Sequence, residues 1–310
     1  MPPIHETPPE VVEEHPSPWP KEETSVRLLE WGTETGNVLL ELMKAPILLS
    51  GIVCLGLTTT GCHATSGPRE ASETATVEYV AHACFRISSP SGRSVMIDPY
   101  ESRWWLGYDF PDDLGATDAV LISHPHSDHD GGQAAGRKLP WAPGTAVITD
   151  PGSYELGDIK VVGIRGKHAD PYGKEFGQIN TIWLLEIAGL RIVHVGDNGP
   201  ITDAIAEQVG RVDILMLPID SDYHILKREE IEAFREKLAP AILIPMHYRH
   251  PDLEPDPDRP DGLGELDGWL EEQDNVRRLA THTWQLGRSE LPSSSQVLVF
   301  EHSPTVTPPR

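Results

Sequence analysis

The chain has 310 residues, 38% of them hydrophobic and 24% charged, and its 48 acidic and 25 basic side chains give a formal net charge of -23. This composition fits a globular protein with one large α/β domain or two small ones. A nucleic-acid-binding protein normally needs a basic surface, so the acidity argues against a polynucleotide partner and leaves a small-molecule substrate. Three cysteines without a C-x-x-C pair exclude a disulfide scaffold.

The N-terminal region divides into segments of different composition. Residues 1–42 are acidic and rich in proline, and such a segment is expected to be disordered. Met43-Lys44 then opens a basic start, an apolar run from Ile47 to Leu57 and a small-residue region that ends at Gly61-Cys62. This order resembles a bacterial lipoprotein signal peptide over residues 43–61, with Cys62 as the acylated residue and Met43 as the true start of translation.

The lipoprotein interpretation predicts a protein of the bacterial cell envelope, held on a membrane through lipidated Cys62. Two alternatives remain open, an uncleaved membrane anchor and a hydrophobic linker, and with a linker the protein would be cytoplasmic. The apolar run is shorter than the ~20 residues that a membrane-spanning helix needs. We expect residues 62–75 to be a tether, residues 76–302 the folded domain and residues 303–310 a disordered tail.

Beyond the tether, short β-rich runs bounded by turn residues predict most of the regular structure. One of them, Asp118–Ser123, is almost continuously apolar, as in a strand buried on both faces. The predicted strands are Thr76–Ala81, Cys84–Ser88, Ser94–Asp98, Asp118–Ser123, Thr145–Thr149, Ile159–Ile164, Thr181–Ile187, Arg191–Val195, Val212–Leu217, Ala241–Pro245 and Gln296–Glu301. The predicted helices are Gly131–Arg137, Thr202–Val209, Lys227–Lys237 and Leu263–Gln273. Strands come first and then alternate with helices, which favours two sheets sandwiched by helices over a single parallel sheet.

The most informative motif follows the buried strand, in the sequence His124-Pro125-His126-Ser127-Asp128-His129. His124 and His126 can point the same way at the strand's end, and Asp128 and His129 follow on the same short loop. Imidazole and carboxylate groups at this spacing are typical metal ligands. The sequence therefore predicts a metal site at this end of the strand.

The motif resembles the His-x-His-x-Asp-His signature of the metallo-β-lactamase superfamily, and the order of the later elements agrees over residues 76–302. The resemblance implies an α/β fold, an αββα sandwich of two mixed β-sheets flanked by helices. It also implies three further ligands, each in its own motif: His168, Asp197 and His247. The closest subgroup looks like the ascorbate-6-phosphate-lactonase-like hydrolases, which share an opening like Tyr79–Cys84 and a strand ending like Ile97–Tyr100.

This ligand set implies two divalent metal ions, zinc first, with manganese or iron as alternatives. His124, His126 and His168 would hold one ion, Asp128, His129 and His247 a second, and Asp197 would bridge the two. Such a pair can hold a hydroxide nucleophile near neutral pH, which predicts a hydrolase of small esters, lactones or phosphodiesters. Antibiotic-hydrolysing members place a cysteine where Asp197 stands, so the oxygen bridge resembles lactonases, thioesterases and phosphodiesterases. The alternatives are a non-catalytic metal-binding envelope lipoprotein and an iron-dependent redox member of the same fold.

Five further residues are interpreted more weakly. Asp98 is expected to brace the histidine-rich loop, and His82 either faces the pocket or caps a strand. His194 fits a hydrogen-bonded core histidine, and His250 a solvated loop residue. His224, on the loop after Val212–Leu217, is the candidate for substrate contact or leaving-group protonation, which with Asp128 and Asp197 completes the predicted catalytic set.

Overall fold

The structure is a computed structural model, and it describes residues 74–103, 109–112, 114–136, 138–220, 225–252, 263–304 and 306. The chain divides into two units, Met1–Ala64 and Thr65–Arg310, and every described residue belongs to the second. The predicted signal peptide, Cys62 and His224 all lie outside the described residues.

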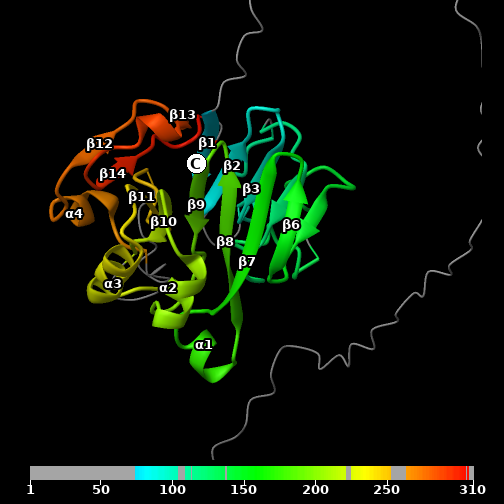
Figure 1. Cartoon of the computed structure of the whole chain (residues 1–310). Coiled ribbons are helices and arrows are strands. Elements are labelled where there is room, and N and C mark those ends of the chain that lie inside the picture. The colour runs from blue at the N-terminus through cyan, green and yellow to red at the C-terminus, as the bar shows by residue number, and fades with distance from the viewer. Residues whose placement is uncertain are drawn as a thin grey trace, which may run out of the picture. The chain divides into compact units, whose positions relative to one another are not determined.

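The described unit consists mainly of strands (Figure 1). In chain order its elements are β1 (Thr74–Ala81), β2 (Cys84–Ser88), β3 (Ser94–Ile97), β4 (Ala119–Leu121), β5 (Ala146–Ile148), β6 (Gly152–Leu156), β7 (Ile159–Lys167), α1 (Tyr172–Glu175), β8 (Ile179–Ile187), β9 (Leu190–His194), α2 (Asp203–Val209), β10 (Ile214–Pro218), α3 (Arg228–Leu238), β11 (Ile242–Met246), α4 (Leu266–Leu270), β12 (Val276–Arg278), β13 (Thr283–Gly287), the 3-10 helix η1 (Arg288–Glu290) and β14 (Gln296–Val299).

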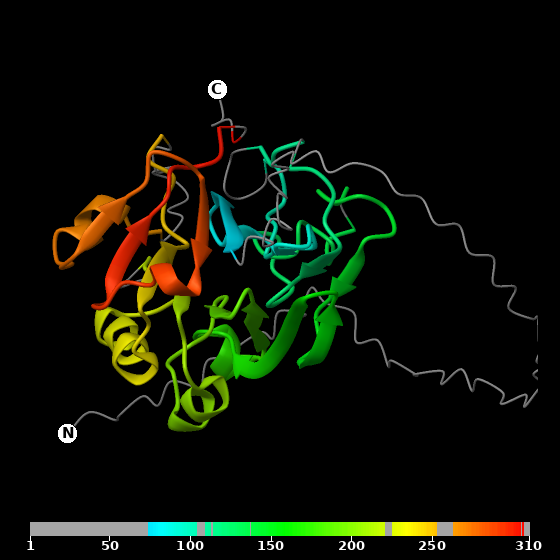
Figure 2. The ribbon, with the colours of Figure 1, turned by 45° about the horizontal axis from the view of Figure 1, so that its top comes forward.

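The strands form two mixed sheets, as the sequence predicts. One sheet has six strands in the order β13-β1-β2-β3-β4-β5, antiparallel from β13 to β3 and parallel from β3 to β5. The other has eight strands in the order β12-β14-β11-β10-β9-β8-β7-β6, parallel from β12 to β9 and antiparallel from β9 to β6. β13 pairs with β1 although about 200 residues separate them, and Figure 2 shows the orange strand beside the cyan one.

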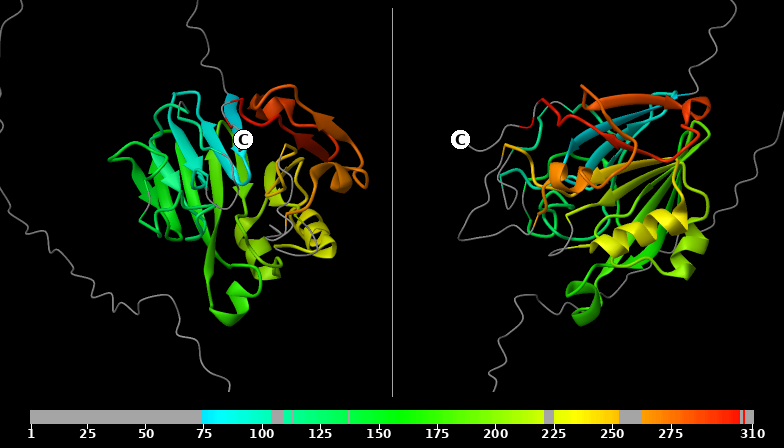
Figure 3. Two further views of the ribbon diagram at one scale, coloured as in Figure 1. Left: turned by 180° about the vertical axis from the view of Figure 1, so that it is seen from behind. Right: turned by 90° about the vertical axis from the view of Figure 1, so that its left-hand side faces the viewer.

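The layers are clearest in the right-hand view of Figure 3, where the six-stranded sheet, the eight-stranded sheet and the pair α2 and α3 follow one another. Helix α3 turns Ile231, Phe234 and Leu238 toward the protein and its charged residues toward solvent. That spacing of three and four residues places the apolar side chains on one helical face, which is why this segment packs as a helix. The predicted helix Lys227–Lys237 is confirmed within one residue at each end.

The core lies between the sheets and contains the inward side chains of both. Phe85 and Ile87 from one sheet and Trp183 and Ile192 from the other are completely buried. A buried aromatic side chain removes some 150–250 Å² from water, so residues such as Trp183 contribute much of the hydrophobic stabilisation. Cys84 is also fully buried and forms no disulfide, so it packs as a small apolar residue.

Some predicted elements differ from the structure. Gly131–Gly136 is a turn rather than the start of a helix, because Gly131, Gly132 and Gly136 all have positive φ and Asp130 accepts hydrogen bonds from two backbone amides of the turn. The predicted helix Leu263–Gln273 is shorter, as α4. Strands β6, β12 and β13 and helix α1 were not predicted.

The folded part extends beyond the predicted limits of 76–302. β1 begins at Thr74, and Ser303 and Val306 are buried, so this part of the expected disordered tail packs on the domain. Among the described residues, no helix is both long and apolar enough to span a membrane.

Candidate metal centre

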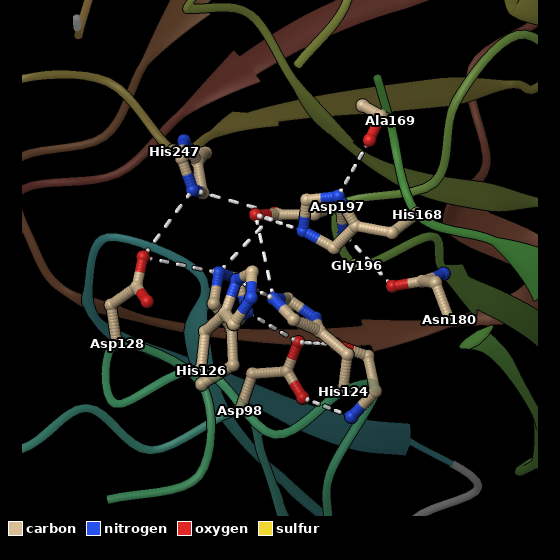
Figure 4. Close-up of polar contacts among 12 residues, drawn as sticks. Asp98, His124, His126, Asp128, His168, Ala169, Asn180, Gly196, Asp197 and His247 are labelled. Atoms are coloured by element: carbon tan, nitrogen blue, oxygen red, sulfur yellow. Dashed lines mark hydrogen bonds and ion pairs between the residues drawn. The ribbon is translucent and has the colours of Figure 1, made fainter. Parts of the chain in front are cut away.

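Strand ends from both sheets bring the predicted ligands together. The histidine-rich loop follows β4 of the six-stranded sheet, whereas His168, Asp197 and His247 follow β7, β9 and β11 of the eight-stranded sheet. Figure 4 shows their side chains converging on Asp197. All seven predicted ligands therefore meet at one place, although the chain separates the first from the last by more than a hundred residues.

The donor atoms fall into two groups, and within each group they lie within 4.8 Å of one another. One group is formed by His124, His126, His168 and Asp197. The other is formed by His82, Asp128, His129 and His247. The first matches the predicted set for one ion, and the second contains the predicted set together with His82.

Asp197 lies between the groups and divides its two oxygens between them. Its Oδ2 is 3.6 Å from Nε2 of His124 and 3.6 Å from Nε2 of His168. Its Oδ1 is 3.2 Å from Nε2 of His129 and 3.4 Å from Nε2 of His247. Donor atoms about 2.0–2.2 Å from a common ion are separated by roughly 3–3.5 Å, so each oxygen is placed to share an ion with one group.

Asp98 fixes the orientation of one histidine in each group. Its carboxylate accepts hydrogen bonds from the backbone amide and the hydroxyl of Ser123 at 2.7 and 2.6 Å, and from Nδ1 of His129 at 2.9 Å. The Ser123 hydroxyl in turn accepts from Nδ1 of His124 at 2.9 Å. Both histidines therefore carry a proton on Nδ1 and turn Nε2 toward the centre, which confirms that Asp98 braces the histidine-rich loop.

The other histidines are oriented by residues that sequence reasoning missed or did not assign. Nδ1 of His247 donates to the buried carboxylate of Asp220 at 3.1 Å. Nδ1 of His168 donates to the carbonyl of Ala169 at 2.9 Å. The terminal amide of Gln178 lies 3.1 Å from Nε2 of His126. The other ring nitrogen of His126, Nδ1, therefore faces the His124 ring.

The backbone of Asp197 is also held in place. The amide of Asp197 donates to Oδ1 of buried Asn180 at 3.0 Å, and the Asn180 side chain donates to the carbonyl of Val195 at 2.8 Å. Gln178 and Asn180 stand at the beginning of β8, before its long apolar stretch. Two amide side chains at the start of an otherwise apolar strand are the signal by which the sequence could have pointed to them.

His82 belongs to the site. It is buried, and Nε2 of its ring lies 3.1 Å from Oδ2 of Asp128. The ring also packs on that of His247, with 4.0 Å between centroids. Its backbone has φ of 56°, a conformation that is uncommon for residues other than glycine. Of the two interpretations open from the sequence, the structure supports the one in which His82 faces the pocket.

The burial of the site changes the charge states of its residues. Burial lowers the pKa of His124 well below the usual range and lowers the pKa of His82 and of His126 to about 4, so these imidazoles are neutral, as metal ligands must be. Burial also opposes a charge on His129 and His247, but nearby carboxylates, Asp197 foremost, outweigh it and raise the pKa of both. The clustered carboxylates thus favour a positive charge between His129, His247 and Asp197.

Three buried donor atoms test whether the residues fit metal ions. Nε2 of His129, Nε2 of His168 and Oδ1 of Asp197 have no hydrogen-bond partner among the described residues. A buried polar atom without a partner costs roughly 1–3 kcal/mol, so three at one point need a ligand to compensate them. All three face the space between the donors, and divalent cations fit both the position and the chemistry of the set.

The remaining histidines have different surroundings. His194 is fully buried, where its Nε2 donates to the carbonyl of Ala83 at 2.8 Å and its Nδ1 accepts from the amide of Gly196. It is thus the core histidine expected, and it links the two sheets. The interpretation of His250 as solvated is wrong, because it is 5% exposed and packs on His302, with 4.1 Å between ring centroids. His224 lies outside the described residues.

Comparisons with known proteins agree with this geometry. A family model described as the beta-lactamase superfamily domain matches residues 76–247. A UPF0173 metal-dependent hydrolase of Thermoplasma acidophilum is 31% identical over 198 residues, which cover 57% of this chain and 85% of the relative. Another, of Pyrococcus furiosus, is 27% identical over 202 residues, covering 59% of this chain and 88% of the relative.

The fold is also found in a solved structure. A metallo-β-lactamase superfamily protein of Thermotoga maritima has a TM-score of 0.55 and 24% identity, covering 74% of this chain and all of the other. The two-sheet sandwich and its histidine and aspartate clusters define a class of metal-binding α/β proteins. Within that class, this chain belongs to the metallo-β-lactamase superfamily and to its UPF0173 metal-dependent hydrolase family.

Proposed function

We propose that the protein is a two-metal hydrolase that cleaves a small ester, lactone or phosphodiester. The observation that carries this proposal is the position of Asp197, whose Oδ1 and Oδ2 face different histidine groups at 3.2–3.6 Å. A carboxylate so placed suits two ions rather than one. Zinc is the first choice for a site with this many imidazoles, and manganese or iron are alternatives.

When bound, two divalent ions supply a hydroxide nucleophile near neutral pH and polarise the oxygen of the bond under attack. The chain's own residues prepare the site for that chemistry. Asp98, Ser123 and Asp220 hold imidazoles with their lone pairs directed inward, so little reorganisation is needed when substrate arrives. His82 acts on Asp128, since its Nε2–H donates to Oδ2 and keeps the carboxylate turned toward His129 and His247.

We favour a lactone as the substrate class, because two segments at the site resemble motifs of the ascorbate-6-phosphate-lactonase-like subgroup. The first, Tyr79–Cys84, contains His82, and the second, Ile97–Tyr100, contains Asp98. Both side chains contact residues of the metal centre. His224 remains our candidate for leaving-group protonation.

Metal analysis combined with a substrate panel tests the proposal. We expect about two divalent ions per chain after reconstitution with zinc or manganese, and turnover of at least one of a set of lactones, carboxylic esters and phosphodiesters. No more than one ion under excess metal would contradict the two-metal model. Two bound ions without turnover would favour a non-catalytic metal-binding protein, and oxygen consumption with iron would favour a redox function.

We further propose that the protein is lipid-anchored through Cys62 in the bacterial cell envelope. The support is the sequence from Met43 to Cys62, and the segment up to residue 73 lies outside the described residues. Expressed in a bacterium, the wild type should partition with membranes and begin with a lipid-modified Cys62, whereas Cys62→Ser should not be lipid-modified. An intact cytoplasmic chain beginning at Met1 would contradict this proposal and leave the hydrolase proposal untouched.

A further inference from the structure

Two exposed aromatic side chains lie next to the metal centre. Only four large hydrophobic residues in the described part of the chain are exposed: Val147, Tyr172, Phe176 and Val276. Tyr172 is 40% exposed and Phe176 71% exposed, and both belong to the segment of α1 that connects β7 to β8. Their ring centroids lie 6.0 Å apart, so they form one aromatic surface. Contiguous exposed apolar surface is a feature of many binding sites, so this aromatic surface beside the metal centre is a candidate for one.

Tyr172 contacts two of the proposed ligands of the first ion. Its ring stands edge-on to His126, with 4.8 Å between centroids, and edge-on to His168, at 5.2 Å. Part of Tyr172 nevertheless remains open to solvent. A molecule whose reacting bond lies at the first ion therefore has Tyr172 beside it, with Phe176 as the next surface outward.

The backbone holds the aromatic pair in this position. The connection from His168 to Gln178 is closed at its base, where the His168 amide donates to the Gln178 carbonyl at 3.0 Å, and Gln178 donates back to the carbonyl of Tyr172 at 3.2 Å. Gly173 packs directly on the His168 carbonyl, since a Cβ at this position would be 1.8 Å from that oxygen. Figure 1 shows α1 at the bottom of the view, where it joins β7 to β8, below helices α2 and α3. Tyr172 is thus fixed relative to the ligand that precedes it.

We propose that Tyr172 and Phe176 form a subsite for an apolar, preferably aromatic, group of the substrate. This inference rests on the proposed hydrolase function and adds the chemical class of the substrate: a small lactone or ester with a flat apolar substituent near the reacting carbonyl. A flat group can stack on Phe176 and meet the open face of Tyr172, which removes apolar surface of both partners from water.

The first experiment measures binding without turnover. Butyrate and 4-phenylbutyrate share a carboxylate that can occupy the metal centre, and only the second carries a phenyl ring. Calorimetric titration of the zinc-loaded full chain should show tighter binding of 4-phenylbutyrate. Tyr172→Ala and Phe176→Ser should each reduce this preference by about 3- to 10-fold, the usual range for loss of one aromatic contact. Tyr172→Phe should retain it, because the ring and not the hydroxyl makes the contact.

The matched control is Val276→Ser, which removes an exposed apolar side chain from β12. It should leave the preference and the metal content unchanged. Because Phe176 is exposed, Phe176→Ser should fold normally even if Tyr172→Ala does not. An unchanged preference for 4-phenylbutyrate in Phe176→Ser and Tyr172→Ala would overturn the proposal. The proposal would also be overturned if Phe176→Ser kept the ligand preference of the wild type but lost self-association in sedimentation, because the aromatic surface would then bind a second copy of the chain.

The second experiment uses turnover of γ-butyrolactone and γ-phenyl-γ-butyrolactone. The wild type should prefer the phenyl lactone, and Phe176→Ser should lose that preference mainly through a raised KM for the phenyl lactone. If neither lactone nor any other substrate is cleaved, the hydrolase proposal fails, whereas the preference for 4-phenylbutyrate still tests the subsite. If both lactones are cleaved equally well by wild type and Phe176→Ser, the subsite fails and the hydrolase proposal stands.

Discussion

At the scale of single residues, the centre depends on which atom of each side chain faces inward. Asp98 determines which nitrogen faces inward in two histidines: it contacts His129 directly, and it contacts His124 through the Ser123 hydroxyl. Removing such an outer partner typically weakens metal binding 10–100-fold. The residues on which activity depends therefore include several that never touch an ion.

The first prediction concerns Asp197. Asp197→Ala removes both oxygens that face the two groups, so we expect fewer bound ions and a loss of activity of more than about 100-fold. The measurements are metal content by atomic emission and steady-state kinetics. His224→Ala is the comparison, and its loss should be smaller with metal content unchanged. Equal, mild losses of activity in Asp197→Ala and His224→Ala would show that Asp197 does not bridge two ions.

The second prediction concerns His82 and separates a hydrogen-bond donor from a metal ligand. His82→Gly leaves the backbone unstrained, because glycine readily adopts φ of 56°. We expect the affinity for one ion to fall about 10- to 100-fold. Added imidazole should restore it, because it can donate to Asp128, whereas 1-methylimidazole should not, because it has a lone pair but no N–H. The measurement is competition with a chromophoric chelator. Equal rescue by both compounds would instead make His82 a ligand.

The ligands themselves could be predicted from the sequence because four stand in one short motif and the others in recognisable neighbourhoods. Their supporting residues could not, since Gln178 just before β8, Asn180 within β8 and Asp220 after β10 reach the centre from segments whose positions depend on the fold. A carboxylate such as Asp220 looks like any loop aspartate until His247 is placed beside it. His250 was misjudged for the same reason, because its burial depends on His302, fifty-two residues later.

At the scale of elements, strands were predicted well where apolar runs were long and turns distinct. Strand β13 was missed because Thr283–Gly287 is partly exposed and has little hydrophobic pattern, and its pairing with β1 at the edge of the sheet is a long-range contact. Strand β12 is exposed throughout and short, so the pattern gives no signal. The wrong helix at Gly131 shows the opposite error, since glycines with positive φ interrupt a segment of helical composition.

The third prediction belongs to this scale and concerns the placement of α1. Gly173→Ala brings a methyl group against the His168 carbonyl, so the segment must move away. We expect a destabilisation of about 1–3 kcal/mol and a reduced preference for 4-phenylbutyrate. Gly268→Ala is the control, because it lies in helix α4 with open space around it and should be neutral or slightly stabilising. Thermal unfolding measures the change in stability, and calorimetric titration measures the preference for 4-phenylbutyrate. A variant as stable as wild type would show that the close contact at Gly173 does not exist.

At the scale of the whole molecule, the centre joins the two sheets. The histidine-rich loop follows a strand of one sheet, and His168, Asp197 and His247 follow strands of the other, so ions bound between them would act as cross-links. The sandwich and its two mixed sheets could be predicted as a class from the resemblance and from the order of elements. The strand order could not, because pairs such as β13 with β1 join segments far apart in the chain.

The fourth prediction follows from this cross-link. An ion at a hundred times its dissociation constant stabilises the folded state by about 2.7 kcal/mol per site, provided that the unfolded chain does not bind it. Removal of metal with a chelator should therefore lower the melting temperature by several degrees, and zinc should restore it. The effect should shrink in Asp197→Ala, which serves as the control. A melting temperature that does not respond to metal would mean that metal binds the folded chain no more tightly than the unfolded chain, and would contradict the cross-link.

The spread of the donors along the chain also has a consequence during synthesis. His247, the last of the predicted ligands, emerges from the ribosome more than a hundred residues after His124, so a nascent chain carries at most part of the donor set for most of its elongation. Strong binding therefore waits until both sheets have folded, and the ions come from whichever compartment the chain folds in. If the chain is exported unfolded, as our proposal for Cys62 allows, the metal supply outside the cytoplasm selects the ions. The same domain produced without its N-terminal segment would fold in the cytoplasm and take its metals from a different pool.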